Sequence, residues 1–265
     1  MKIIHLHSNC FLNIFLFFLY NLKNKKGWNN MSITILKFIA LFCMILDHIG
    51  FFFPNMKCYL FLRIIGRIAA PIYFFCFVEG YKHTHDKKTY RNKLFISSIL
   101  MMIINAWMIT FLQLLNHPLP KNINILTPNM FFTFFILFQI LEGLNYIIDV
   151  FKQKKSNFIE SIFINKHKFL KILYICFVPF IEYKYIAFCS ILIFFYIDNK
   201  YIKYLLFIIS NVIICLLLKN KIELFMLLSI IPLYFYNGKR GNYNSSFFYI
   251  IYPLHFYFLA LLTIF

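Results

Sequence analysis

The chain has 265 residues, of which 62% are apolar, 22% aromatic and 14% charged, and Lys plus Arg outnumber Asp plus Glu by 27 to 9. Soluble domains are nearer half apolar and a quarter charged, so these few charges cannot cover this much apolar material with a polar surface. The mean hydropathy of +0.73 points the same way. These values exclude a soluble enzyme, a disordered tail and a disulfide scaffold, and they predict a polytopic membrane protein.

The first 30 residues differ from the rest of the chain. Their apolar stretch, 10–20, is too short for a comfortable membrane span, and no small-residue cleavage site follows it. Met31 opens the first long apolar run. We expect residues 1–30 to be an N-terminal extension or leader, with Met31 as a candidate for the true start, and residues 31–265 to form one membrane domain.

Successive apolar runs fill the remainder of the chain. Because backbone groups in lipid must be satisfied within the segment, each run predicts a helix. We expect an all-α integral membrane bundle of about nine transmembrane helices, within a range of eight to ten. The runs lie at 33–53, 60–80, 95–116, 130–151, 169–181, 185–198, 203–218, 222–236 and 247–265. The fifth and sixth are short and meet at Pro179 and Glu182, so a re-entrant pair is the alternative there.

The distribution of Lys and Arg predicts the orientation. Alternate threading of nine spans places 19 of the 27 basic residues on one side and 5 on the other. Short loops rich in Lys and Arg stay cytoplasmic, so we expect the N-terminus inside and the protein in the cell membrane as a multi-pass chain. The net charge of +18 is then explained mostly by the orientation of the chain in the membrane. We expect no nucleic-acid partner, since the sequence shows no basic nucleic-acid-binding fold.

The first expected helix carries three ionisable residues, which are expensive in a membrane and therefore candidates for function. Lys37 and His48 are eleven positions apart, which returns them to within about 20° of one face and separates them by roughly 16 Å. Asp47 points elsewhere. The structural alternative is that the Lys37 side chain extends to the membrane interface and that His48 is a core histidine whose hydrogen bonds are made within the protein.

The second expected helix carries two arginines four positions apart. Arg63 and Arg67 therefore share a face, and two adjacent cations need an anion between them. Asp47 is the internal candidate for that anion, and a ligand phosphate or carboxylate is the functional one. Gly66 removes bulk beside the pair and permits a close helix approach. An interfacial position is the alternative for the arginines.

A further set of residues has a supporting role in this prediction. Glu79 and His83 are four apart at the end of the second helix, and the loop after them is more readily a solvated loop than a metal site. Asn129 opens the fourth expected helix, and His255 follows a proline in the last one. We expect no metal. The acids Glu142, Asp149, Glu160, Asp198 and Glu223 fall at ends or in loops and receive no role.

Four stretches together resemble the TraX family. They are LKFIALFCMILDHIGFFF, RIIGRIAAPIYFFCFVEGYKHTHDKKTYRNKL, NMFFTF and YIIYPLHFYF. The likeness runs from about Met31 to the C-terminus, and residues 1–30 have no counterpart. The chain also resembles, more distantly, the acyltransferase-3 group of membrane acetyltransferases. Two motifs of that group have counterparts here. One is a basic residue followed after ten residues by a His, matched by Lys37 and His48, and the other is R-x-x-x-R, matched by Arg63 and Arg67.

The resemblance implies a membrane acetyltransferase with acetyl-CoA as the donor, since TraX proteins are known as acetylases of a pilin N-terminus. Combined with the polar residues of the spans, it leads to the hypothesis of a catalytic base at His48 with Asp47 beside it, and of contacts to acetyl-CoA from Lys37, Arg63 and Arg67. His255 would then act as a second proton relay. The acceptor stays open between the amine of a pilin-like N-terminus and the hydroxyl of a surface glycan.

Two other classes of function remain. Intramembrane His, Asp and Arg also suit a proton-coupled secondary transporter or permease, although no internal repeat is visible. A non-catalytic membrane assembly protein is the third possibility, and dependence of activity on His48 separates it from an enzyme.

Overall fold

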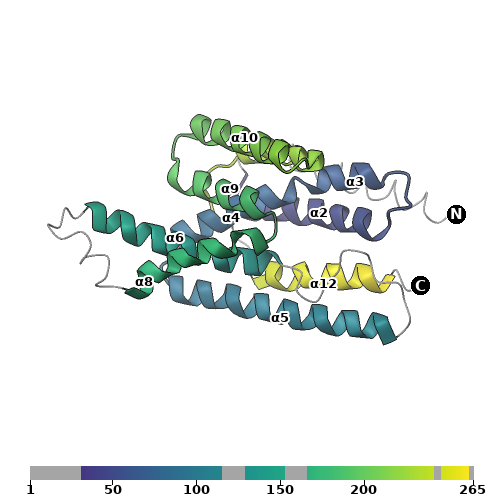
Figure 1. Ribbon diagram of the computed structural model, residues 1–265. Helices are drawn as coiled ribbons and strands as arrows, with labels where there is room; N and C mark the ends of the chain where they lie inside the picture. Colours follow the sequence, from purple (N-terminus) through teal and green to yellow (C-terminus); the bar gives the residue numbers. More distant parts are fainter. Residues whose placement is uncertain (1–30, 115–128, 153–165, 242–245, 263–265) are drawn as a thin grey trace.

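A computed structural model describes residues 31–114, 129–152, 166–241 and 246–262, so the expected N-terminal extension lies outside the described residues. The described part is a bundle of helices with their long axes mostly aligned (Figure 1). In chain order the helices are α2 (Ile33–Phe52), α3 (Tyr59–Gly66), α4 (Ala69–His83), α5 (Lys87–Leu114), α6 (Met130–Lys152), α8 (Lys166–Leu170), the 3₁₀ helix η2 (Lys171–Phe180), α9 (Lys184–Tyr196), α10 (Lys200–Leu217), the 3₁₀ helix η3 (Lys221–Ser229), α11 (Ile230–Tyr234) and α12 (Ser246–Leu262).

Short polar side chains begin several of these helices by accepting hydrogen bonds from otherwise unpaired backbone N–H groups. Ser32 does so for α2 and Asn129 for α6. Asn199 accepts from two backbone N–H groups at the start of α10. Asp86 accepts from Thr89 at the start of α5, and hydrogen bonds from the side chain and backbone of Thr89 hold the pKa of Asp86 below its usual value. The sequence therefore fixes where these helices begin.

Among the described residues, five helical segments are long and apolar enough, by length and composition, to cross a membrane. They are Ile33–Phe52, Tyr59–His83, Lys87–Phe111, Met130–Lys152 and Lys200–Leu217. Each lies on one of the expected apolar runs, which supports the prediction of an all-helical membrane protein. The other expected runs form shorter helices, so the count of about nine spans stays a prediction.

The second of these spans is interrupted where α3 meets α4. The backbone N–H of Arg67 donates to the carbonyls of Arg63 and Ile64, and the helix restarts at Ala69. Helix α2 packs along both α3 and α4, so this break lies beside the interior of α2. Arg67 consequently sits in the middle of the bundle and is 5% exposed.

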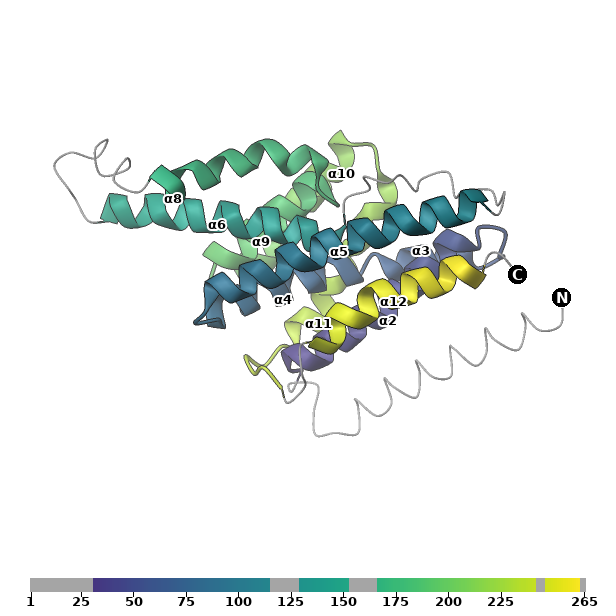
Figure 2. The ribbon, with the colours of Figure 1, turned by 90° about the horizontal axis from the view of Figure 1, so that it is seen from below.

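The two short runs form a helical hairpin whose turn is buried inside the bundle. Helices η2 and α9 pack against α6, and α9 also packs against α4 (Figure 2). The turn contains Ile181, which is 1% exposed, and the backbone N–H of Glu182 donates to the Thr133 hydroxyl at 3.0 Å. A hairpin whose turn packs against α6 agrees with the re-entrant pair that the sequence left as the alternative, and whether either helix crosses the membrane stays a prediction.

Several helix ends meet at one end of the bundle, which we call the basic end. There the backbone of Met31 and Thr34 bonds to the 235–240 segment, and the Tyr236 hydroxyl donates to Glu79 at 2.9 Å. Lys82 lies 3.8 Å from Asp198 in the turn before α10. The loops expected to be rich in Lys and Arg begin or end here, while which side of the membrane this end faces stays a prediction.

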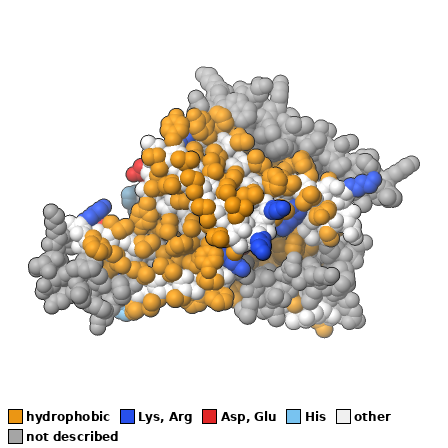
Figure 3. Space-filling model, turned by 45° about the horizontal axis from the view of Figure 1, so that its top comes forward, with side chains coloured by type: hydrophobic (Ala, Val, Ile, Leu, Met, Phe, Trp, Pro, Cys, Tyr) orange, Lys and Arg blue, Asp and Glu red, His pale blue; other side chains and the backbone are white. Residues whose placement is uncertain are grey.

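The outer surface of the bundle is apolar. Helix α10 exposes Leu205, Ile209, Ile213 and Leu216, and hydrophobic side chains cover most of the described surface in a view from its side (Figure 3). The closely packed core lies inside, between α2, α4, α6 and α9. A protein surrounded by lipid needs an apolar outer surface, and polar groups are tolerated in its interior, where other protein groups can bind them.

Candidate functional site

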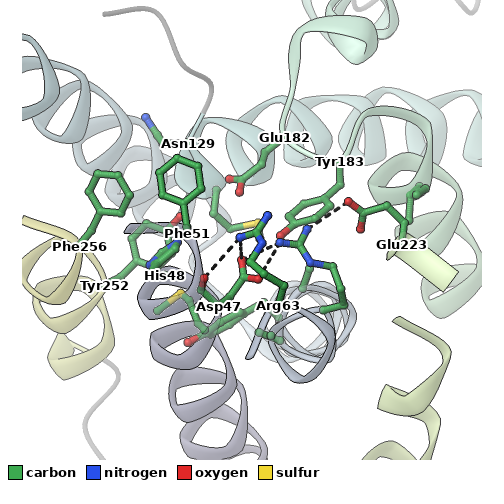
Figure 4. A pocket seen from close by; sticks show the side chains of 18 of the residues that line it. Asp47, His48, Phe51, Arg63, Asn129, Glu182, Tyr183, Glu223, Tyr252 and Phe256 are labelled. Atoms are coloured by element: carbon green, nitrogen blue, oxygen red, sulfur yellow. Dashed lines mark hydrogen bonds and ion pairs between the residues drawn. The ribbon is translucent and has the colours of Figure 1, made fainter. Parts of the chain in front are cut away.

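A cavity of about 550 Å³ lies in the middle of the bundle, beside the α3–α4 break. Its walls come from α2, α3, α4, α5 and α12, from the start of α6, from the hairpin turn, and from the start of η3 with the segment before it (Figure 4). Of the residues expected to be functional, those that line it are Asp47, His48, Arg63, Arg67 and Asn129. The structure thus brings together the polar residues that the sequence singled out in three separate expected helices.

Asp47 lies between the two arginines, as the sequence predicted. Its carboxylate accepts from Nη2 of Arg67 at 2.8 and 2.7 Å and lies 2.9 Å from Nη1 of Arg63. The side chains of Arg67 and Asp47 are 6% and 9% exposed, whereas that of Arg63 is 24% exposed. Arg67 is therefore an interior anchor, and Arg63 is the guanidinium with more access to the cavity.

Close approach of α2 and α3 makes this pairing possible. A Cβ atom at Gly66 would lie 2.2 Å from Cβ of Asp47, a distance that packed atoms do not adopt. Only glycine leaves room for Asp47 at this point. The expectation that Gly66 permits a close helix contact is confirmed.

Glu223 completes the ionic cluster from the opposite side. Its Oε1 accepts from Nη1 of Arg67 at 3.1 Å and from the Asn220 amide at 3.4 Å. No role is predicted for this acid from sequence, because it falls near the start of a short apolar run. The two guanidinium groups and the carboxylates of Asp47 and Glu223 form a set of two positive and two negative charges.

A chain of three groups fixes the protonation state of His48. Nδ1 of His255 lies 2.8 Å from the backbone carbonyl of Ile251, and Nε2 of His255 lies 2.7 Å from Nδ1 of His48. The carbonyl can only accept, so Nδ1 of neutral His255 carries the proton and its Nε2 accepts from His48. Nε2 of His48 is therefore left with a free lone pair.

The geometry of the two rings supports an in-plane hydrogen bond. Their planes differ by 11°, and their centroids are 4.9 Å apart. Because the bonded nitrogens are only 2.7 Å apart, this centroid separation places the rings edge to edge rather than face to face. The two histidines, 207 positions apart in the chain, are held in one fixed arrangement.

Lys37 lies outside this cavity, beside a smaller one of about 80 Å³ on the same side as the start of α2. Tyr73, Met130 and Tyr252 line both cavities, so the two adjoin. The Lys37 ammonium lies 5.5 Å from the centre of the Phe248 ring, and no acid pairs with it among the described residues. The structure separates Lys37 from the ionic cluster and places it at the approach to the cavity from the basic end.

The remaining supporting residues are divided between the cavity and the basic end. Asn129 lines the cavity, where its amide donates to the Ser98 carbonyl at 3.2 Å. Glu79 and the largely exposed His83 lie 3.6 Å apart at the basic end, away from the cavity. Within the described ranges, no three His, Cys, Asp or Glu side chains are placed to share a metal ion.

Sequence reasoning missed the hairpin turn as a wall of the site. Glu182 and Tyr183 line the cavity, and the Tyr183 ring lies 5.9 Å from the Arg67 guanidinium. A signal was present, since Glu182 is an acid between two short apolar runs beside a proline. It was read as a loop position because nothing local shows that the turn is buried.

The family model described as TraX protein matches residues 32–263. A probable fimbrial assembly protein, FimC of serogroup H1, from Dichelobacter nodosus is 32% identical over 81 residues, which cover 30% of this chain and 33% of that protein. An uncharacterized protein of Rickettsia prowazekii (strain Madrid E) is 34% identical over 82 residues, 31% of this chain and 28% of that protein. The matches thus span about a third of each relative's length. No solved structure matches the chain.

Proposed function

The chain belongs to the TraX family, and we propose that it is a membrane acetyltransferase that moves an acetyl group from acetyl-CoA to an amine or hydroxyl. The observation that carries the proposal is the unprotonated Nε2 of His48, a residue that lines the cavity and whose ring is oriented by the hydrogen bond to His255. Imidazole is the side chain best suited to move a proton near neutral pH.

The proposed reaction transfers the acetyl group directly from acetyl-CoA to the acceptor. The N–H or O–H group of the acceptor gives its proton to Nε2 of His48, and its nitrogen or oxygen attacks the thioester carbon. The carbon–sulfur bond then breaks, and the leaving thiolate takes the proton back from His48 to give CoA. His255 does not pass the proton on, because its other nitrogen faces the backbone carbonyl of Ile251, which cannot become protonated under these conditions.

The arginines supply positive charge where negative charge develops. Attack on the thioester places a negative charge on its oxygen, and fixed donors in a site without bulk water stabilise such an oxyanion by a few kcal/mol. Arg63, the more accessible of the pair, takes this role. Arg67 holds Asp47 and Glu223 and so positions Arg63 through their shared contact with Asp47.

The adjoining smaller cavity provides the approach for the donor. Lys37 lies roughly 16 Å along α2 from His48, a length comparable to the arm that joins the CoA nucleotide to its sulfur. Its unpaired ammonium can hold a phosphate of acetyl-CoA while the thioester reaches the main cavity. This arrangement requires the basic end to face the cytoplasm, and we place the protein in the cell membrane with its N-terminus inside.

The acceptor class follows from chemistry and from one relative. Either an amine or a hydroxyl can be acetylated by this step. The relative named as a fimbrial assembly protein favours an acceptor in pilus assembly, such as a pilin-like N-terminus, with a surface glycan as the other candidate. The same name also favours a non-catalytic assembly role as the second candidate function for this chain.

Release of CoA thiol from acetyl-CoA by the purified full-length chain, with glycinamide or methyl α-glucoside supplied as the acceptor, tests the proposal. Wild-type protein is expected to release thiol, and His48→Ala is expected to lower the rate by about 10²–10⁴-fold, the range for loss of a general base. His83→Ala is the control, because His83 is exposed and far from the cavity. An assembly protein without catalysis would release no thiol, and equal rates for wild type and His48→Ala would exclude His48 as the base.

A further inference from the structure

The turn that carries Glu182 has an unusual backbone. Tyr183 and Lys184 adopt φ values of 59° and 44°, the left-handed region that residues other than glycine rarely enter. Such conformations persist only where the surroundings hold them, and they gather at functional sites. Here Thr133, which is fully buried in α6, accepts the Glu182 backbone N–H, while Tyr183 packs edge-on against Phe74.

The result of this fixed turn is that Glu182 faces the cavity. It reaches the cavity from the hairpin, and Asp47 and Arg63 reach it from α2 and α3 (Figure 4). Its carboxyl group makes no hydrogen bond or ion pair with the described residues, because the one bond at Glu182 involves the backbone N–H. A carboxyl group in such a place is costly unless something binds it.

Among the described residues, no cation around the cavity pairs with Glu182. Asp47 and Glu223 pair with the two arginines, and Lys184 on the turn, which also lines the cavity, has an exposed side chain and forms no ion pair with Glu182. Glu182 therefore stands outside the ion pairs that join the described charges of the cavity. Its carboxyl group is left open to a hydrogen-bond donor or a positive charge that enters the cavity.

We propose that Glu182 binds the acetyl acceptor by accepting a hydrogen bond from an N–H or O–H group close to the atom that is acetylated. This inference rests on the proposed function, because it assigns a substrate to the same cavity. The donor is the less suitable occupant, since Glu182 is not part of the smaller cavity at Lys37 and a carboxylate repels the phosphates of acetyl-CoA. The site therefore favours acceptors that are neutral or positive near the reacting atom, and it disfavours anionic ones.

Kinetics with two small acceptors test this assignment. Glycinamide supplies an amine and methyl α-glucoside a hydroxyl, and initial rates are measured while each substrate is varied in turn. Glu182→Ala is expected to raise KM for the acceptor that the wild type uses by tenfold or more, with KM for acetyl-CoA unchanged. Glu182→Gln keeps the shape and an acceptor oxygen, so it should retain a hydroxyl acceptor better than a charged amine.

Two further variants separate binding from general damage to the protein. Thr133→Val removes the hydroxyl that holds the turn and should raise the acceptor KM in the same direction, by a smaller factor. Glu142→Gln alters an acid at the basic end and should change neither KM. An unchanged acceptor KM in Glu182→Ala, or an increase in KM for acetyl-CoA instead, would overturn the assignment.

Chemical labelling gives a readout that does not depend on activity. Dicyclohexylcarbodiimide reacts with protonated carboxyl groups in membrane interiors, and mass spectrometry then locates the label. We expect the label at Glu182, which forms no ion pair with the described residues, and not at Asp47 or Glu223, whose carboxylates are paired with the arginines. No label at Glu182 overturns the inference even in an active protein, whereas label at Glu182 in a protein that releases no CoA thiol overturns the proposed function and with it the identity of the ligand.

Discussion

The protein contains two ionic clusters of similar composition in different surroundings. In the cavity, Asp47 lies between Arg63 and Arg67. Near the basic end, Glu142 lies between Arg91 and Lys171. The Asp47 and Arg67 side chains are 9% and 6% exposed, while those of Glu142 and Arg91 are 21% and 26% exposed.

The difference in exposure changes what each cluster does. Water screens the second cluster, so its net contribution to stability is small. In the first cluster Asp47 and Arg67 are largely shielded from water, and each of these two charges depends on the other, because an uncompensated buried charge costs several kcal/mol. A buried cluster is therefore a poor choice for stability alone, which is why the cavity and not the basic end is the place to expect chemistry.

The largest expected effect is on the buried cluster. Asp47→Asn leaves Arg63 and Arg67 facing each other without their shared anion, and we expect a loss of about 3–5 kcal/mol in the free energy of unfolding. Thermal unfolding of the purified protein in detergent measures it. A melting temperature equal to that of the wild type would show that the cluster does not depend on Asp47.

Substitution of His255 tests whether its hydrogen bond orients His48, the proposed base. His255→Phe keeps a ring but removes the acceptor for Nδ1–H of His48, so we expect roughly a 100-fold loss in kcat, within the range for general-base catalysis. His255→Gln offers a carbonyl oxygen and should recover part of that rate. If the two variants are equally inactive, His255 carries a proton itself, and its role is not only to orient His48.

Gly66→Ala tests the close approach behind the buried cluster. The new Cβ would lie 2.2 Å from Cβ of Asp47, so α2 and α3 must separate, and we expect a loss of about 1–3 kcal/mol from overpacking. Gly80→Ala is the matched control in α4, since its new Cβ would meet only the end of the Tyr90 side chain at 3.1 Å. Similar melting temperatures for the two variants would contradict the packing argument.

The smallest effect is expected in the second cluster. Glu142→Gln removes the anion between Arg91 and Lys171, where water can solvate both cations, and we expect a change below about 1 kcal/mol. CoA release should equal that of the wild type. A loss as large as that of Asp47→Asn would mean that burial does not distinguish the two clusters.

The helical character of the fold was predictable because lipid allows few other solutions for long apolar runs. The start and end of α6 agree with its apolar run to within one residue. The short runs around Pro179 were ambiguous for a physical reason, since a helix of about 13 residues is shorter than the hydrocarbon core and forms either half a crossing or a span where the bilayer is locally thinned. Their partners in α4 and α6, which no local pattern specifies, decide between these.

The same limit applies to the site. Asp47, His48, Arg63 and Arg67 were predictable because charged side chains are conspicuous in apolar runs, and a spacing of four puts two of them on one face. Glu223 could not be predicted, because it meets Arg67 across 156 positions of the chain. A contact between residues so far apart in the chain cannot be recognised from the residue spacing of a single sequence.

The hydrogen bond between His48 and His255 also has a consequence for biosynthesis. Helix α2 is the first described helix to leave the ribosome and α12 the last, so the base is oriented only after the whole described bundle has been inserted. A chain stalled or cleaved before α12 would hold a complete arginine cluster and a His48 ring free to rotate. Under the proposed function, the chain would become active only once insertion of the described helices is complete.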